Sequence, residues 1–403
     1  MYKRIAEISI TLGLMIIADS CAEEDWAIAY QDRTFCPVVN IYTKDGQEID
    51  SKDTYKEAII SISESDGYDF TDSATIKGRG NSTWKRPKKP YTIKFFQKRS
   101  VLSLPENKTW ILLANYYDPT LLRNHIGFYL GEISALSYTP HYHFVDCYLN
   151  GEYRGIYQLG EKIKIAKHRL NIGDDGFLLE VDWRAREDEV VFSTPHLKHP
   201  VNIKSPEVTV NDEAYNYIKD YVRKAEEALY AENFADSIEG YRKYMDVGSF
   251  VEYYLINEIA KSEDAPFFTS CYMNLKRGGK LNMGPVWDFD MAFGNSGYAG
   301  IDSPKGFYMN KYWYERLLED TAFVASVKER FKYYYESRER LYERIDTKAS
   351  MLVGHIVDDN KLWGRVKNKE NASEQEVKDA YIQKVTKLKT WLEDRFNWLK
   401  DNL

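Results

Sequence analysis

Cysteine is scarce in this chain, which has four cysteines in 403 residues. A secreted domain held together by disulfides needs a denser cysteine pattern. Cys36, Cys147 and Cys271 also lack the short paired spacing of a thiolate zinc site. The scarcity excludes a disulfide framework and leaves Cys21 for a separate role.

An excess of positive charge is absent as well. The net charge is −7, which offers no field to attract a phosphate backbone, so we expect no nucleic-acid partner. Apolar residues make up 43% of the chain and aromatic residues 15%. This composition excludes a disordered chain and supports a large core, in two or three domain-sized units or one two-lobed globule.

After its N-terminal stretch the chain has no apolar run long enough to cross a membrane as a helix. Lys3 and Arg4 precede an apolar stretch, residues 8–18, which ends shortly before Cys21. This stretch is short for a transmembrane helix but is typical of a signal-peptide core. A cysteine after such a core resembles the lipidation site of bacterial lipoproteins, so we predict that Cys21 is acylated.

We therefore expect residues 1–21 to be a lipoprotein signal peptide and residues 22–34 to be an exposed tether. The acidic residues 22–25 are similar to the export tag of some surface lipoproteins. The predicted location is exported, at the outer membrane or the cell surface. An ordinary secretory signal cleaved nearby is the alternative.

The residues that carry the chemistry are expected in the stretch KLNMGPVWDFDMAFG, residues 280–294. We predict a strand through Trp287 that leads into Asp288 and Asp290. Residues two apart on a strand point to the same face, so the two carboxylates should repel each other. A divalent cation such as Mg²⁺ or Mn²⁺ would remove this repulsion, because Mg²⁺ typically takes one or two carboxylates. A strand end with a solvated acidic turn is the alternative.

A hairpin should bring a third acid to the same place. Residues 268–275 and 280–287 read as two strands joined by a Gly-Gly turn. The loop before the first strand carries Asp264, and Asp288 follows the second. The hairpin should therefore bring Asp264 and Asp288 to the same end, which predicts a site with two acids.

A basic, glycine-rich loop precedes these elements in the chain. The sequence KGRGNSTW, residues 77–84, lies between two predicted strands. Backbone N–H groups of such loops can bind phosphate, which makes Gly78, Arg79, Gly80 and Asn81 candidate nucleotide contacts. The loop lacks a Walker lysine and the third glycine of the kinase loop, and a basic hairpin turn is the alternative.

Lys94 lies on the strand after this loop, within Tyr-Thr-Ile-Lys. Its placement parallels the strand lysine that contacts nucleotide phosphates and a helical glutamate in kinases. We expect Glu161, at the start of a predicted helical and basic stretch, to be that glutamate. A lysine on a solvated strand face is the alternative.

The pattern of the remaining chain predicts an α+β fold. Residues 35–165 read as a β-rich N-terminal lobe, with a hairpin at Asn150-Gly151. Residues 166–403 read as an α-rich C-terminal lobe that carries the acidic hairpin. Amphipathic helices are expected over residues 211–232 and after the capping box at 373–376.

Several of these segments together resemble one family. The segments GRGNSTW, KKPYTIKF, LLANYYDPTLLRN, YLNGEYRGIYQLGEKI, IKSP and GPVWDFDMAFG occur in the order seen in the spore-coat-protein-H-like kinases, the CotH family. The resemblance runs from about Val38 to Phe331. It implies an atypical protein-kinase-like, two-lobed fold that uses ATP and a divalent metal and phosphorylates Ser or Thr of secreted proteins.

The resemblance also implies site residues. Asp288 matches the metal-ligand position of the family, with Asp290 beside it, and Asp264 matches the catalytic aspartate, although Ser-Glu-Asp stands here for Asn-x-Asp. Two other functions remain open. The chain could be a surface-anchored binding or structural module without turnover, because ATP is scarce outside cells. A histidine-based metal hydrolase would need His141, His143, His196 and His199, which lack a third ligand nearby in sequence.

Overall fold

The structure is a computed structural model that describes residues 35–63 and 69–403. Cys21, the predicted signal peptide and the predicted tether lie outside these residues. Cys36, Cys147 and Cys271 are buried free thiols. Within the described ranges, no helix combines the length and apolarity that crossing a bilayer requires. Helices and strands are both abundant, which confirms the predicted α+β class.

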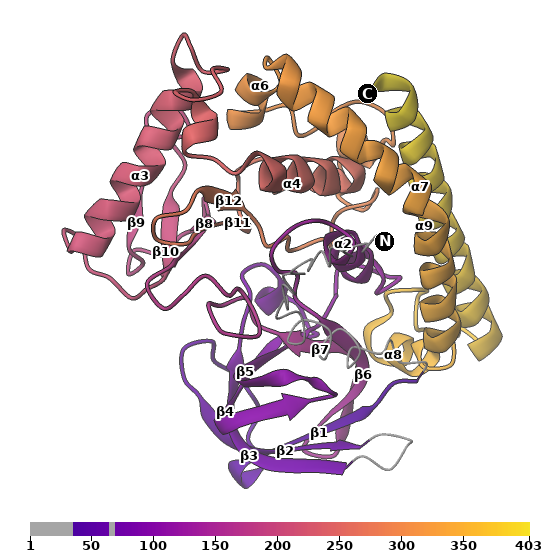
Figure 1. Ribbon diagram of the computed structural model, residues 1–403. Helices are drawn as coiled ribbons and strands as arrows, with labels where there is room; N and C mark the ends of the chain where they lie inside the picture. Colours follow the sequence, from indigo (N-terminus) through magenta and orange to yellow (C-terminus); the bar gives the residue numbers. More distant parts are fainter. Residues whose placement is uncertain (1–34, 64–68) are drawn as a thin grey trace, which may run out of the picture.

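The N-terminal part folds into a closed β-barrel (Figure 1). Its strands follow the order β1-β2-β3-β4-β5-β7-β6, and a parallel pairing of β1 with β6 closes it. Alternate residues such as Ile60, Ile93 and Trp110 point into the barrel and are at most 1% exposed. The strands are β1 (Val38–Thr43), β2 (Lys56–Ser63), β3 (Asp69–Gly78), β4 (Tyr91–Val101), β5 (Leu104–Leu113), β6 (Tyr142–Leu149) and β7 (Glu152–Glu161), with 3-10 turns η1 (Lys44–Gly46) and η2 (Thr83–Lys85).

A second sheet and most helices form the rest of the molecule. The sheet has the strand order β12-β11-β8-β10-β9. Its strands are β8 (Phe177–Val181), β9 (Val191–Phe192), β10 (Val201–Ser205), β11 (Cys271–Leu275) and β12 (Leu281–Met283). Helix α4 (Val247–Ala260), which is buried almost throughout, packs against β12 and leads toward the predicted acidic loops.

Most of the remaining helices lie around α4, whereas α8 lies beside the barrel (Figure 1). They are α2 (Arg123–Glu132), α3 (Glu213–Tyr230), α5 (Ala299–Asp302), α6 (Trp313–Leu317), α7 (Thr321–Leu352), α8 (Ile356–Trp363) and α9 (Glu374–Asn402), with the 3-10 turn η3 (Tyr241–Lys243). α2 lies between the barrel and the other helices, and α7 packs along α9. The predicted capping box of α9 is confirmed, since Ser373 and Glu376 bond reciprocally.

Two local predictions were wrong. β12 ends at Met283 and does not continue to Trp287, because Pro285 has no N–H to extend the ladder. Asp288 then adopts a left-handed conformation with φ 66°, so Asp288 and Asp290 are loop residues and do not alternate along a strand. Glu161 is the last residue of β7, and no helix follows it.

Candidate active site

The loop between α4 and β11 carries Asp264. α4 ends at a C-cap, Lys261, in the left-handed conformation, and this turns the chain toward β11. The carbonyl oxygen of Asp264 then accepts a hydrogen bond from the N–H of Phe268 over 3.1 Å. The half-buried Asp264 side chain is thereby presented from a short, closed turn.

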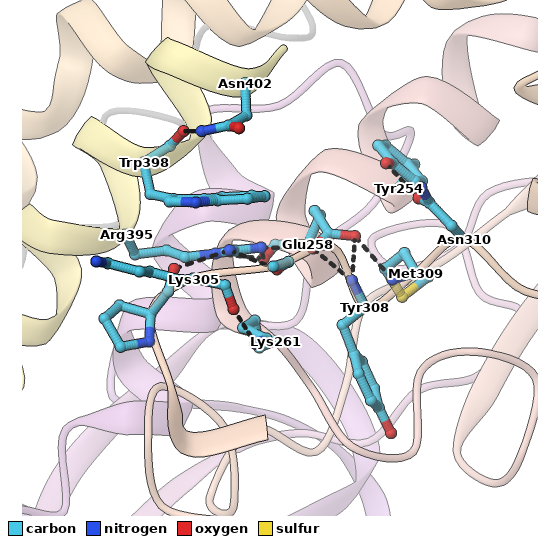
Figure 2. A network of polar contacts seen from close by, with 12 residues as sticks. Tyr254, Glu258, Lys261, Lys305, Tyr308, Met309, Asn310, Arg395, Trp398 and Asn402 are labelled. Carbon is cyan, nitrogen blue, oxygen red and sulfur yellow. Dashed lines mark hydrogen bonds and ion pairs between the residues drawn. The ribbon is translucent and has the colours of Figure 1, made fainter. Parts of the chain in front are cut away.

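The end of α4 is held by two buried cations (Figure 2). Lys261 donates through Nζ to the carbonyl oxygens of Gly300, Ser303 and Lys305 over 2.8–2.9 Å. Arg395 of α9 forms an ion pair with Glu258 in which both side chains are fully buried. Glu258 also accepts hydrogen bonds from the N–H groups of Tyr308 and Met309. The loop before Asp264 and residues 300–309 are therefore fixed to one another.

The second acidic loop follows β12. Asp288 accepts a hydrogen bond from the hydroxyl of Ser270 over 3.1 Å, so it faces the end of the Asp264 loop. The next N–H, of Phe289, donates to Asn124 Oδ1 over 2.7 Å. Asn124 in turn bonds Asn115, and Asn115 bonds Gln158 of β7. A chain of side-chain amides thus connects this loop to the barrel.

Glycine makes the approach of α2 to this loop possible. A Cβ on Gly127 would lie 2.1 Å from the ring of Phe289. The ring therefore packs directly on the helix backbone, and any larger residue at this position would displace the acidic loop.

The structure brings the predicted carboxylates together in a partly buried setting. Burial and neighbouring charge raise the pKa values of these groups. Burial, then the charge of Asp288, raises the pKa of Asp264 to about 7. Burial also raises the pKa of Asp288, against the hydrogen bond from Ser270 and the charge of Arg79. The pKa of Asp290 is raised well above its usual range by burial, then by Asp288 and Asp118. The site therefore concentrates negative charge that its own cations do not balance.

The glycine-rich loop reaches the acidic loops through one side chain. The guanidinium of Arg79 lies 5.5 Å from the centre of the Trp287 ring and lowers the pKa of Asp288. The N–H groups of Gly78 and Arg79 do not face a ligand, because they donate to the carbonyl oxygens of Ser51 and Pro90. Gly80 has φ 85°, and Asn81 is exposed.

The predicted ion pair between Lys94 and Glu161 is not formed. Glu161 is buried and pairs with His141 over 3.1 Å and Arg169 over 3.6 Å. It lies opposite Trp110, which lies opposite Ile93, so these three residues share a face. Lys94 is one residue further along β4, on the other face, and is exposed. Strand alternation thus separates the two side chains.

Sequence reasoning missed residues that lie close to Arg79 or to the acidic loops. Lys162, directly after β7, is accessible to solvent but lies among protein atoms and cations. Desolvation, then the charges of Arg79 and Lys204, lowers its pKa to about 8. Asp182 follows β8 and accepts a hydrogen bond from the hydroxyl of Thr269 over 2.6 Å. Their only signal was position, since each directly follows a strand.

The histidines serve other contacts. His141 pairs with Glu161, His196 stacks on Tyr230, and His199 bonds the carbonyl oxygen of Phe267. Among the described residues, no group of three or more His, Cys, Asp or Glu side chains is close enough to hold a metal without further ligands. A metal at this site would therefore need ligands from water or substrate.

Comparison with protein-family models gives a match. A search of curated proteins finds none. The family model described as CotH kinase protein matches residues 76–399. This range contains the glycine-rich loop, both acidic loops and most of α9, and it covers more than half of the chain. The chain therefore belongs to the CotH kinase protein family.

Proposed function

We propose that this protein is an exported kinase that transfers the γ-phosphate of ATP to Ser or Thr of secreted or cell-surface proteins. The observation that carries the proposal is the meeting of two acidic loops opposite a basic loop of the barrel. Burial, then the charge of Asp288, raises the pKa of Asp264, and the charge of Arg79 acts on Asp288. Family membership supports a kinase-like protein.

In this proposal the barrel and the C-terminal part act as the two lobes of a kinase-like fold. Residues 35–165 form the N-terminal lobe and residues 166–403 the C-terminal lobe. Arg79 and Lys162 extend from the barrel side, and the carboxylates extend from the other. A nucleotide between them would have its phosphates near the cations and its metal near the acids.

The donor set fits Mg²⁺ or Mn²⁺. Both ions prefer carboxylate oxygens, and Mg²⁺ typically takes one or two of them and completes its sphere with water and phosphate. Asp288, with Asp290 beside it, would hold the metal, and the raised pKa values indicate uncompensated charge that a cation would balance. When bound, the metal would neutralise charge on the phosphates.

Asp264 is the proposed catalytic residue. Its pKa of about 7 suits a group that orients the acceptor hydroxyl and accepts its proton near neutral pH. As that proton moves to Asp264, the hydroxyl oxygen forms the new bond to the γ-phosphorus and the bond to ADP breaks. Arg79 and Lys162 would hold phosphate oxygens through charge-assisted hydrogen bonds.

Export and anchoring complete the proposal. The basic and apolar leader supports a lipoprotein signal at residues 1–21, with Cys21 acylated and residues 22–34 as the tether. The enzyme would then face its substrates at the outer membrane or the cell surface.

A non-catalytic module on the same scaffold is the second candidate. One observation favours it: the lysine–glutamate pair that anchors ATP in typical kinases is not formed here by Lys94 and Glu161. Nucleotide affinity separates the two candidates, because a module without turnover needs no metal-dependent ATP binding.

The decisive activity test uses radiolabelled ATP. Residues 26–403 would be incubated with ATP, Mg²⁺ or Mn²⁺ and a secreted-protein extract. We expect labelled Ser or Thr with the wild type, none with Asp264→Asn, and wild-type labelling with the control Asp174→Asn in an exposed loop. Equal labelling by wild type and Asp264→Asn would contradict the assignment of Asp264.

A further inference from the structure

Beside Asp264 lies a group of aromatic side chains that the proposed chemistry does not use. Trp183 is 57% exposed and Phe268 is 36% exposed. Their rings are nearly parallel, with centroids 6.5 Å apart. His199 contacts Trp183, with ring centroids 5.2 Å apart, and Tyr312 contacts His199 at 4.9 Å. We call these four residues the aromatic shelf.

The shelf is rigidly connected to the acidic site. The N–H of Trp183 donates to the carbonyl oxygen of Phe268 over 2.8 Å, and the N–H of Phe268 donates to that of Asp264 over 3.1 Å. The residues beside Trp183 and Phe268 are also joined, because Thr269 bonds Asp182. Any molecule that places a hydroxyl at Asp264 therefore has its neighbouring groups near the shelf.

The exposure of Trp183 and Phe268 leaves apolar ring surface in contact with water. Burying a large aromatic side chain typically stabilises a fold, yet more than half of the Trp183 side chain is exposed. Rigid aromatic side chains such as Trp are enriched at binding hot spots, because they add contact area at little entropic cost.

We propose that the aromatic shelf binds an aromatic or large aliphatic side chain of the acceptor protein, within a few residues of the phosphorylated Ser or Thr. This rests on the proposed kinase function and names its substrate class. The polar groups beside the rings already have partners within the protein, which favours a peptide over a sugar. Arg184 lies over Phe268 at 5.7 Å, and His199 already bonds Phe267 and Tyr312. An apolar side chain needs only the ring surface, whereas sugar hydroxyls need several donors and acceptors.

The test uses the full-length chain and a peptide library with a central Ser and each other position varied. With Mg-ATP, we expect one position near the Ser to select Phe, Trp, Leu or Met. For the best peptide, Trp183→Ala should raise KM about 10-fold to 30-fold. Its kcat and its KM for ATP should not change, and Trp183→Phe should restore most of the loss. The control is Phe96→Ala, because Phe96 is also 57% exposed but lies on β4.

Binding of the same peptide in the absence of nucleotide, measured by fluorescence anisotropy, separates the two proposals. Phosphotransfer without apolar selection, or with selection unchanged in Trp183→Ala, would overturn the shelf and leave the kinase function intact. Peptide binding that needs Trp183, but without phosphotransfer, would support the shelf and contradict the kinase function. Binding of oligosaccharides in place of peptides would overturn the peptide class.

Discussion

Arg79 acts on Asp288 from the barrel side, and Lys162 lies close enough to Arg79 for the two charges to interact. Arg79 stacks over Trp287, and Lys162 has a pKa lowered to about 8, first by desolvation and then by Arg79 and other cations. Cations held close together repel one another and destabilise a site unless an anion balances them. ATP phosphates would provide that anion.

At the residue scale, this arrangement predicts which cations hold ATP. Arg79→Met and Lys162→Met should each weaken Mg-ATP binding about 10-fold or more, because each removes a charge-assisted hydrogen bond. Affinity should also fall as the pH rises through about 8, where Lys162 loses its proton in the absence of ligand. Calorimetric titration at pH 7 and pH 9 measures both effects.

Lys94→Ala is the matched control for these variants, because Lys94 is an exposed lysine on the outside of the barrel. It should bind Mg-ATP as the wild type does. A large loss of affinity in Lys94→Ala, with none in Arg79→Met, would contradict this account and restore the lysine that the strand motif predicts.

The acids could be predicted from the sequence and the cations only in part. A hairpin brings its two ends together whatever its details, so Asp264 and Asp288 meet even though β12 is shorter than expected. The prediction that Lys94 pairs with Glu161 depended on whether each side chain points into or out of the barrel. A one-residue difference along a strand reverses that facing, and the sequence does not specify it.

At the scale of elements, α8 connects the C-terminal helices to the barrel. Asp359 accepts hydrogen bonds from the buried Lys88 over 2.6 Å and from the N–H of Ile156 over 2.9 Å. His355, the residue before α8, pairs with Asp146 of β6 over 2.6 Å. These contacts fix the barrel relative to the helices that support Asp264.

The pair formed by His355 predicts a pH dependence of stability. The hydrogen bond to Asp146 raises the pKa of His355 above its usual 6.5. Its contribution is therefore complete below about pH 6.5 and is lost as the pH rises through the raised pKa. His355→Gln should lower stability below pH 6.5, by under about 1 kcal/mol because the pair is partly exposed, and should change little at pH 9.

Denaturant unfolding of wild type and His355→Gln between pH 5.5 and 9 checks this. His168→Gln, in an exposed loop, is the control. A difference between wild type and His355→Gln that grows with rising pH would contradict the assigned pair.

Elements with strong local signals were predicted well. The apolar spacing of residues 211–232 gave α3, and the Asn-Gly turn gave the β6–β7 hairpin. The basic stretch after Glu161 was wrongly predicted as a helix, since no element begins there. Its shape depends on long-range contacts such as Arg169 over Trp110, at 5.1 Å, which a local pattern does not contain.

At the scale of the whole molecule, contacts between distant residues decide the architecture. β1 pairs with β6 to close the barrel, and Lys88 pairs with Asp359 across 271 positions of sequence. The family resemblance anticipated a β-rich part followed by helices. The closure of the barrel was not predicted, because parallel pairing of distant strands leaves no local signature.

Membrane anchorage is also a property of the whole chain. If Cys21 is acylated, Cys21→Ala should release the protein from membranes or block its maturation, since the acyl chains on that residue would provide the anchor. Fractionation of cells that express each form measures this. Membrane association of Cys21→Ala equal to that of wild type would contradict the lipoprotein prediction.

The most direct test of the central claim is calorimetric titration of Mg-ATP or Mn-ATP into wild type and Asp288→Asn. The substitution keeps the shape of the side chain and removes one of the crowded charges. We expect metal-dependent ATP affinity to fall on the order of 100-fold or more. The ligand-free variant should be no less stable than wild type, because a carboxylate repelled by its neighbours is replaced by a neutral amide. Equal affinity of both proteins would contradict the metal site, and no binding by wild type at millimolar nucleotide would contradict the kinase.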